Sequence, residues 1–265
     1  MMRELLELAV KAAILGAEEI LAVYGMDFEV EFKEDKSPLT LADRRSHEAI
    51  LRMLSTTPYP VLSEEGKDIP FETRQTWNRF WLVDPLDGTK EFVKRNGEFT
   101  VNIALIDNGK PVLGVILVPV TGKLYYAASG TGAFMTGLMD DVEEDVNALI
   151  RRSGLLPLHE SPDGFRVVCS RSHMSPETAE YLEKLKPEHP DMEFVSIGSS
   201  LKLCLIAEGS AQVYPRFGPT MEWDTAAGQA IVEISGGYVH EVVTGEPMRY
   251  NKENLLNPWF IAGRK

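Results

Sequence analysis

The stretch WLVDPLDGTKEF, residues 81–92, starts as an apolar strand and then breaks at an acid, a proline and a second acid. Asp84 and Asp87 flank Pro85 and Leu86 in this stretch. Two like charges this close repel each other unless a cation lies between them. The stretch therefore predicts a buried strand that ends in a cation site.

A second apolar segment, YPVLSEEG at residues 59–66, also ends in acids, Glu64 and Glu65. Strand ends are where α/β folds place their sites. Carboxylates without His or Cys nearby favour a hard cation with oxygen ligands, so we expect Mg²⁺. For Asp84 and Asp87 alone, helix capping and turn solvation would be the better explanation, and Glu64 shifts the balance towards a metal.

The residues that follow Asp84 indicate a phosphate as the second partner. Pro85 fixes the backbone and has no N–H to donate, so the turn can direct the Leu86 carbonyl at the same ion. Gly88 permits a tight approach, and Thr89 opens the next helix, whose free N–H groups can bind phosphate oxygens. A cation site beside an anion site predicts metal-assisted phosphate hydrolysis.

Composition excludes several other classes of protein. The formal net charge of -13 over 265 residues makes nucleic acid an unsuitable partner. No apolar run is long enough to span a membrane. An amphipathic helix expected over residues 3–24 could lie on a membrane, but packing within the protein is favoured. Cys169 and Cys204 fit neither a disulfide framework nor a zinc spacing, which indicates reduced thiols in a cytoplasmic protein.

The first part of the chain is expected to combine helices with a strand meander. A helix follows the loop that starts at residue 35. Strands are expected in 79–84 and, with turns at Asn108-Gly109 and Thr121-Gly122, three times in 99–129. The buried stripe of the helix would contain Ala42, Ala49, Ile50, Met53 and Leu54.

Beyond the acidic run at residues 139–146, strand and helix patterns alternate, which predicts an α/β layer. We place a domain boundary near this run, with an α+β domain at 1–148 and an α/β domain at 149–265. Strands are expected in 165–170, 193–197, 211–217, 237–243 and 259–263, and helices in 175–186, 200–209 and 225–237.

Four motifs resemble, in order, the landmarks of the inositol monophosphatase superfamily of Mg²⁺-dependent, lithium-sensitive phosphatases. They are DKSPLTLAD at 35–43, SEE at 63–65, DPLDGTKEF at 84–92 and EWDTAAGQAI at 222–231. The resemblance implies the five-layer α/β/α/β/α sandwich of that superfamily. The segments 97–115, 197–219 and 255–260 further resemble its bacterial 3'(2'),5'-bisphosphate nucleotidases.

The resemblance also implies roles for individual residues. Two or three Mg²⁺ ions would be held by Glu64, Asp84, Asp87, Asp224 and the Leu86 carbonyl, with Asp224 reaching the cleft from the second domain. Catalysis would rest on Glu64, Thr89 and Asp43. Asp43 would accept the hydrogen bond of the Thr89 hydroxyl, and Thr89 and Glu64 would hold the attacking water. A simple helix cap is the alternative for Asp43.

A nucleotide bisphosphate is the implied substrate. Arg216 stands where inositol monophosphatases carry a Glu that binds inositol hydroxyls, and its planar guanidinium suits a second phosphate. Ser199 and Lys202 resemble residues that hold the nucleotide, with Ser199 or Ser200 donating hydroxyl hydrogen bonds, and His173 resembles a histidine beside adenine. A surface lysine and a surface histidine are the alternatives for these two. The remaining substrate contacts would come from Glu64, Leu86, Asp87, Gly88, Thr89 and Asp224.

The implied reaction is hydrolysis of the 3'-phosphate of adenosine 3',5'-bisphosphate to AMP and phosphate, with the sulfated relative 3'-phosphoadenosine 5'-phosphosulfate as a further substrate, in sulfur assimilation. Activity on inositol monophosphate or fructose 1,6-bisphosphate is one alternative, and a catalytically inactive nucleotide-binding protein is another. The sequence leaves open a homo-oligomer and a peripheral contact with the cytoplasmic side of the inner membrane.

Overall fold

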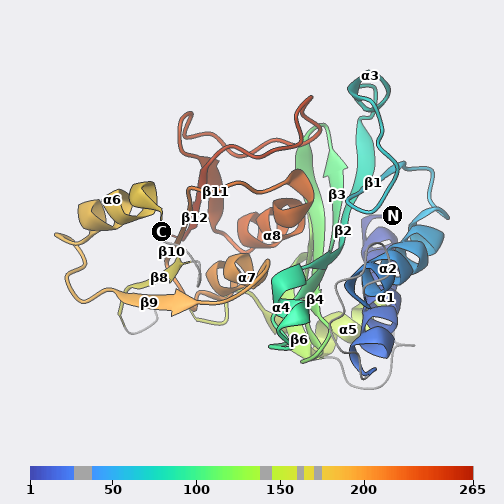
Figure 1. Cartoon of the computed structure of the whole chain (residues 1–265), viewed down its shortest axis with the longest axis horizontal. Coiled ribbons are helices and arrows are strands. Elements are labelled where there is room, and N and C mark those ends of the chain that lie inside the picture. The colour runs from blue at the N-terminus through green and yellow to red at the C-terminus, as the bar shows by residue number, and fades with distance from the viewer. Residues whose placement is uncertain (27–37, 138–144, 160–163, 170–174, 265) are drawn as a thin grey trace.

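Five layers, alternately helical and sheet, make up the molecule (Figure 1). The computed structural model describes residues 1–26, 38–137, 145–159, 164–169 and 175–264. Within these ranges the order of layers is α/β/α/β/α, which confirms the expected sandwich. None of the described helices combines the length and the apolar character that a membrane crossing requires.

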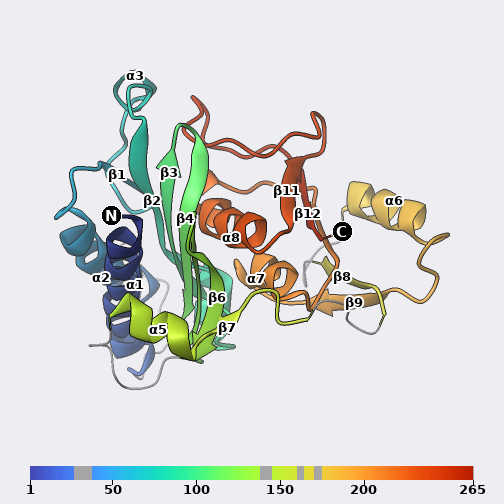
Figure 2. The ribbon, with the colours of Figure 1, turned by 180° about the vertical axis from the view of Figure 1, so that it is seen from behind.

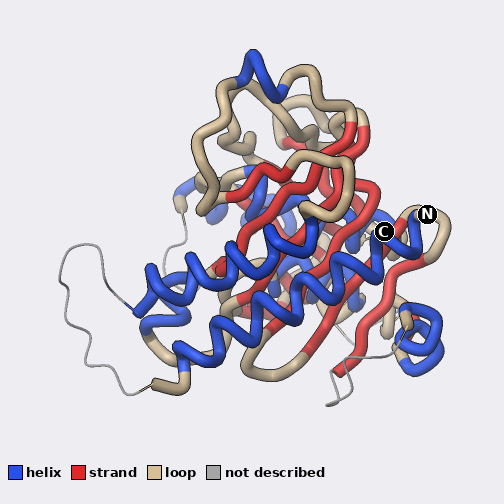
Figure 3. Tube along the Cα trace, turned by 90° about the vertical axis from the view of Figure 1, so that its right-hand side faces the viewer, coloured by secondary structure: helices blue, strands red, loops and turns tan. Residues whose placement is uncertain are grey.

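The first layer contains α1 (Met2–Tyr24) and α2 (Pro38–Leu54), which lie side by side across the first sheet (Figure 3). They approach closely at Gly16, where an added Cβ would lie 2.8 Å from the Ser46 hydroxyl oxygen. The predicted stripe of α2 is buried at Ala42, Ala49, Ile50 and Leu54, while Met53 is only partly buried. A short helix, α5 (Val146–Arg152), completes this layer beside α1.

The first sheet has seven strands that lie in chain order. β1 pairs parallel with β2, and every later neighbour is antiparallel. The predicted meander is β3–β5, and Asn108 and Gly109 adopt positive φ in its first turn. The strands are β1 (Val61–Ser63), β2 (Arg79–Asp87), β3 (Thr100–Asp107), β4 (Lys110–Val118), β5 (Lys123–Ala128), β6 (Gly132–Gly137) and β7 (Gly154–Leu155).

The prediction that a strand ends at Asp84 is wrong by three residues. β2 continues to Asp87, and its register with β3 shifts in between: Asp84 faces Asn102, whereas Asp87 faces Thr100. β2 therefore carries one residue more than its partner, as in a β-bulge, where a proline without an N–H is tolerated. The two aspartates lie on either side of this bulge.

Both faces of the first sheet are buried, which explains its long apolar runs. Trp81 and Val83 of β2 belong to the core under α1 and α2. Phe80 and Leu82 belong to a second core beneath the central helices α7 (Leu201–Glu208) and α8 (Glu222–Ile234). Successive side chains of a strand point to opposite faces, so β2 contributes to two layers at once.

The second sheet lies beyond α7 and α8, and α6 (Pro176–Leu185) covers its outer face (Figure 2). Its order is β11-β12-β10-β8-β9, with β10, β8 and β9 parallel. All five of its strands, and the helices α6, α7 and α8, overlap predicted segments. The strands are β8 (Arg166–Cys169), β9 (Glu193–Ser196), β10 (Val213–Arg216), β11 (Tyr238–Glu241) and β12 (Phe260–Gly263).

Two short helices, α3 (Phe71–Arg74) and α4 (Thr89–Val93), follow β1 and β2. Sequence analysis anticipated α4 but not α3, α5, β6 or β7. β6 is rich in glycine and β7 has only two residues, so neither carries a clear strand pattern. β7 pairs with β6 in the first sheet, and the domain boundary near residue 148 stays a prediction.

Candidate metal and phosphate site

Three carboxylates from three elements converge beside the first sheet. One carboxylate oxygen each from Glu64, Asp84 and Asp224 lies within 4.8 Å of the other two. Glu64 is at the exposed edge of the group, Asp84 is buried and Asp224 is intermediate. Folding thus brings together residues that are 160 positions apart (224 minus 64).

The parallel pair β1–β2 positions the first two acids. The Glu64 N–H donates to the Val83 carbonyl at 3.2 Å, which holds Glu64 beside the end of β2. The Asp84 carboxylate accepts the Leu86 N–H at 3.1 Å, and this bond shapes the bulge. From α2, the buried Ser46 hydroxyl donates to the Pro85 carbonyl at 3.0 Å. The bulge is therefore held from inside and from the adjacent helix.

Asp224 is placed by the first turn of α8. Its Oδ2 accepts the Met221 N–H at 2.8 Å, which is a capping interaction. α8 can approach its neighbours because of small residues, as the run Ala226-Ala227-Gly228 predicts. A Cβ on Gly228 would lie 2.3 Å from Leu203 of α7, and one on Gly114 of β4 would lie 2.3 Å from the Ala227 carbonyl oxygen.

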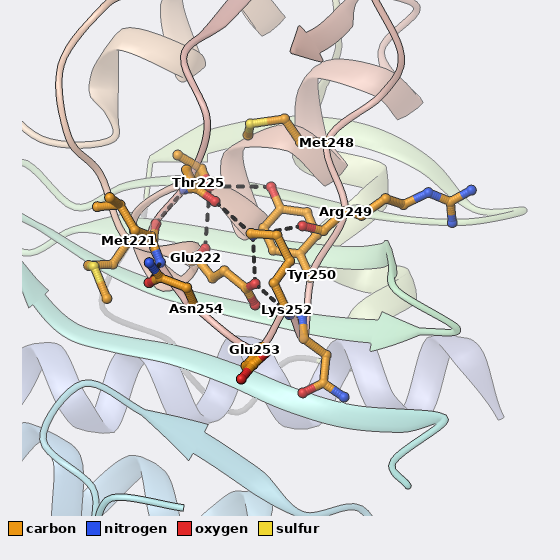
Figure 4. A network of polar contacts seen from close by, with 12 residues as sticks. Met221, Glu222, Thr225, Met248, Arg249, Tyr250, Lys252, Glu253 and Asn254 are labelled. Atoms are coloured by element: carbon orange, nitrogen blue, oxygen red, sulfur yellow. Dashed lines mark hydrogen bonds and ion pairs between the residues drawn. The ribbon is translucent and has the colours of Figure 1, made fainter. Parts of the chain in front are cut away.

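A polar network fixes the N-terminus of α8, with the fully buried Glu222 at its centre (Figure 4). The Glu222 carboxylate accepts the backbone N–H groups of Asn251 and Lys252 at 2.6 and 2.9 Å, and the Lys252 ammonium at 2.6 Å. The Asn257 amide donates to the Met221 carbonyl at 2.6 Å and to the Thr225 hydroxyl at 2.9 Å. The loop before β12 therefore anchors the turn that carries Asp224.

The converging acids have no ion-pair partner within the part of the chain that the structure describes. Among the described residues, no ion pair joins Glu64, Asp84, Asp87 or Asp224 to a Lys or Arg side chain. Burial, with repulsion from Asp87 and Glu64, raises the pKa of Asp84 well above its usual range. Burial and Asp87 raise the pKa of Asp224 to about 7. Burial, Glu65 and Asp87 also raise the pKa of Glu64. A divalent cation with oxygen ligands fits this donor set, because it would replace the repulsion with attraction.

Asp87 lies outside the triad. Its Oδ2 accepts the Ser200 hydroxyl at 2.9 Å, with Thr100 and Asn102 farther away at 3.4 and 3.5 Å. Gly88, which follows it, has a φ of 101°, and a Cβ there would lie 2.0 Å from the Ser199 hydroxyl oxygen. Only glycine fits this approach of the 197–200 loop to the end of β2.

Asp43 lies on α2, buried near the acids that follow β1. Burial, with repulsion from Glu65 and Glu64, raises its pKa to about 8. Thr89 is exposed at the start of α4, and no hydrogen bond between Asp43 and Thr89 is present among the described residues. The pairing of these two side chains stays a prediction.

A pocket of about 600 Å³ opens beside the triad, with Asp87 and Asp224 in its lining. Lys202 and Arg216 also line it, so the pocket combines acids with two cations. Lys202 donates to the Ser199 carbonyl at 2.7 Å and to the Ile197 carbonyl at 3.4 Å, and burial lowers its pKa. Arg216 donates through Nη2 to the Pro219 carbonyl at 2.9 Å, while its buried Nε has no partner among the described residues.

The remaining predicted contacts differ in how the structure places them. The Ser199 hydroxyl lies 2.9 Å from the Asp87 carbonyl and 2.7 Å from the Glu98 carbonyl, so its single proton is used within the protein. His173 lies outside the described residues. Sequence reasoning missed Ser46 and Asn102. The signal for Asn102 was a polar side chain inside the apolar strand TVNIALID, whereas Ser46 on α2 gave none.

Comparison with known proteins agrees with this geometry. The family model described as the inositol monophosphatase family matches residues 1–259. The 3'(2'),5'-bisphosphate nucleotidase CysQ of Salmonella typhimurium is 49% identical over 262 residues, which cover 97% of this chain and 98% of the relative. That of Escherichia coli K12 is 49% identical over 252 residues, covering 92% and 94%.

A solved structure, the crystal structure of CysQ from Bacteroides thetaiotaomicron, matches with a TM-score of 0.94 and 52% identity, covering 100% of this chain and 98% of the other. These sequence identities extend over nearly the whole chain, and the solved structure has the same fold. The chain therefore belongs to the inositol monophosphatase family.

Proposed function

We propose that this protein is an Mg²⁺-dependent 3'(2'),5'-bisphosphate nucleotidase that hydrolyses the 3'-phosphate of adenosine 3',5'-bisphosphate to AMP and phosphate. The sulfated relative 3'-phosphoadenosine 5'-phosphosulfate would be processed in the same way. The proposal rests on one observation above all: an uncompensated carboxylate triad lies beside a pocket that contains Lys202 and Arg216. The nucleotidases at 49% identity support the same reaction.

The acids would hold two or three Mg²⁺ ions. The ligands would be Glu64, Asp84, Asp87, Asp224 and the Leu86 carbonyl. Bound Mg²⁺ lowers the pKa of water and neutralises charge on a transferring phosphoryl group. The buried position of Asp84 keeps that charge interaction in a low-dielectric environment, where it is stronger than in water.

Water would be oriented by side chains on both sides of the cluster. Glu64 lies at the exposed edge of the triad, where solvent reaches it. Thr89 begins α4 directly after the bulge and is exposed. Asp43 would accept the hydrogen bond of the Thr89 hydroxyl, and it accepts more strongly when it is ionised. Its raised pKa falls once a cation is bound nearby, because an opposite charge favours the carboxylate.

The second phosphate would be held by the cationic part of the pocket. The Arg216 Nε–H has no partner among the described residues, so it is available for a phosphate oxygen. An ammonium group has three donors, and two of those of Lys202 bind carbonyls, which leaves one for the ligand. A buried donor without a hydrogen-bond partner destabilises the folded protein. A bound phosphate would supply a partner to both Arg216 and Lys202.

The nucleoside would lie between these cations and the outer part of the pocket. Ile197, Tyr214 and Phe217 supply apolar surface, and Ser175 and Thr178 of the α6 N-terminus supply hydroxyl groups. His173, proposed beside the adenine, precedes Ser175 by two positions. An inositol ring would use none of the apolar surface, and this favours a nucleotide over inositol monophosphate.

The chain is further proposed to work in the cytoplasm. Both cysteines, Cys169 and Cys204, are buried and unpaired, which supports a reducing compartment.

Phosphate release from four substrates would test the proposal. Purified protein is mixed with adenosine 3',5'-bisphosphate, 3'-phosphoadenosine 5'-phosphosulfate, inositol 1-phosphate or fructose 1,6-bisphosphate, each with Mg²⁺ or with a chelator. We expect Mg²⁺-dependent release, with the highest kcat/KM for the two nucleotides. A preference for inositol 1-phosphate or fructose 1,6-bisphosphate would replace the proposed substrate, and no release from any compound would indicate a binding protein without activity.

A further inference from the structure

The buried hydroxyl of Ser200 lies between Asp87 and Asp224, two acids of the candidate site. Ser200, which immediately precedes α7, is 4% exposed. Its Oγ lies 2.9 Å from Asp87 Oδ2 at the end of β2 and 2.8 Å from the Asp224 carbonyl oxygen in α8. A third neighbour, the Asn102 Nδ2 of β3, lies 2.9 Å away. The hydroxyl thus contacts three elements from two layers.

The neighbours of this hydroxyl determine the direction of its proton. The Asn102 amide nitrogen also faces Asp87 Oδ2 at 3.5 Å, a place where a carbonyl oxygen would be repelled by the carboxylate. The Asn102 N–H therefore donates to Ser200, and the single Ser200 proton goes to one of the two oxygens. A carboxylate is the stronger acceptor, so the proton goes to Asp87 Oδ2 and fixes the orientation of this carboxylate.

The 197–200 loop is held firmly enough to serve as a support. The Gly198 N–H donates to the Glu98 carboxylate at 2.8 Å, and the Lys202 ammonium donates to the Ser199 carbonyl at 2.7 Å. Ser199 adopts a φ of 48°, in the left-handed region. Such a conformation is unfavourable for serine and persists only when its surroundings enforce it. Ser200 therefore has a defined position from which to orient Asp87.

We propose that Ser200 is a positioning residue for the metal site, orienting Asp87 and keeping it at a fixed separation from Asp224. The inference rests on the proposed function in one respect, namely that these two acids bind Mg²⁺. Ser200 lies in the lining of the pocket, but its hydroxyl is engaged with Asn102, Asp87 and the Asp224 carbonyl, so it would act on the ion through Asp87. Hydrogen-bond partners that orient metal ligands typically contribute about 10–100-fold to metal affinity, and we expect an effect of that size.

The chain offers a matched control in Ser210, which follows the C-terminal end of α7. Its hydroxyl also donates to a carboxylate, Glu208 Oε2, at 2.8 Å. Glu208 is bonded to the Tyr125 hydroxyl at 2.5 Å and is not among the proposed metal ligands. Ser200→Ala and Ser210→Ala thus remove the same kind of bond, and only one of them involves a proposed ligand of Mg²⁺.

The test is calorimetric titration of metal-free protein with Mg²⁺, without any nucleotide. We expect the Kd for Mg²⁺ to rise about 10–100-fold in Ser200→Ala and to stay at the wild-type value in Ser210→Ala. At saturating Mg²⁺, the KM of Ser200→Ala for adenosine 3',5'-bisphosphate should match the wild type. General loosening of the loop would instead raise that KM, because Lys202 is held by the Ile197 and Ser199 carbonyls of this loop.

Each outcome decides a different point. A folded Ser200→Ala protein with the wild-type Kd overturns the positioning role and leaves the proposed function intact. Wild-type protein that binds no Mg²⁺ overturns the proposed metal site itself. If Ser200→Ala does not fold, Asn102→Ala takes its place, since it removes the donor that directs the Ser200 proton. An unchanged Kd for Mg²⁺ in that variant contradicts the inference.

Discussion

At the scale of single residues, the molecule concentrates negative charge where no ion pair within the described residues neutralises it. Asp84 is the extreme case, since it is buried and surrounded by Asp87, Glu64 and Asp224. The acids before and after the bulge could be predicted from their positions at the ends of apolar segments. The contacts of Ser200 and Asn102 with Asp87 could not, because the role of a hydroxyl or an amide depends on the partner that folding brings to it.

Replacement of Asp84 tests whether this charge is functional. Asp84→Asn keeps the shape of the side chain but removes the charge that would bind the cation, and we expect kcat to fall by at least about three orders of magnitude. The metal-free variant should be no less stable than the wild type, because a repelled buried charge is gone. Steady-state phosphate release and thermal unfolding measure the two effects.

The exposed acid Asp68, in the loop after β1, provides the control. Asp68→Asn should leave turnover unchanged. Near-normal turnover in a folded Asp84→Asn protein would contradict the metal-dependent account.

At the scale of elements, sequence patterns predicted β8 to β12 and α6 to α8, because strand and helix periods alternate in that part of the chain. They placed the end of β2 too early, since a proline between two acids looks like a strand end. The strand continues through the bulge, because Pro85 lies where no hydrogen bond to β3 is needed. Beyond it, β2 pairs with β3 again in a register shifted by one residue. Local patterns do not contain this information, because the register depends on the partner strand.

The N-terminus of α8 supplies a prediction at this scale. Glu222→Gln removes the charge that binds the Lys252 ammonium and two backbone N–H groups, and we expect the free energy of unfolding to fall by about 1–3 kcal/mol. Urea unfolding of the metal-free protein measures this change. Glu246→Gln, at an exposed position, should lie within about 0.5 kcal/mol of the wild type. Equal stability of both variants and the wild type would mean that the network does not anchor α8.

At the scale of the whole molecule, the site exists only when the layers are stacked. Glu64 follows β1 and Asp84 lies on β2 of the first sheet, whereas Asp224 comes from the helical layer between the two sheets. No spacing rule connects these positions, and only the resemblance of EWDTAAG to a family motif indicated Asp224 beforehand. Stacking also buries the acids, and their titration is therefore linked to folding.

This linkage predicts how stability depends on pH. The folded pKa is about 8 for Asp43 and about 7 for Asp224, well above the unfolded values near 4. Between about pH 4 and pH 8 the unfolded chain releases protons that the folded protein retains, so the metal-free protein loses this contribution to stability as the pH rises. Mg²⁺ would replace those protons, so its stabilising effect should grow over the same interval.

Thermal unfolding with and without Mg²⁺ at pH 6 and pH 8.5 measures the effect as a difference in Tm. We expect the Mg²⁺-induced increase in Tm to be larger at pH 8.5. Titratable groups far from these acids change both curves at a given pH equally and cancel in this difference. An increase that is the same at both values, or larger at pH 6, would contradict the linkage.

The central claim is that one phosphate is cleaved at the acids while Arg216 holds another. The most direct measurement is kcat/KM for adenosine 3',5'-bisphosphate and for 3'-AMP, in the wild type and in Arg216→Glu, at saturating Mg²⁺. Losing a charge-assisted hydrogen bond costs about 1.5–3 kcal/mol, or roughly ten- to a hundredfold, before repulsion is added. The account predicts a loss of at least this size for the bisphosphate and little change for 3'-AMP, which lacks the second phosphate. An equal loss for both substrates would contradict it.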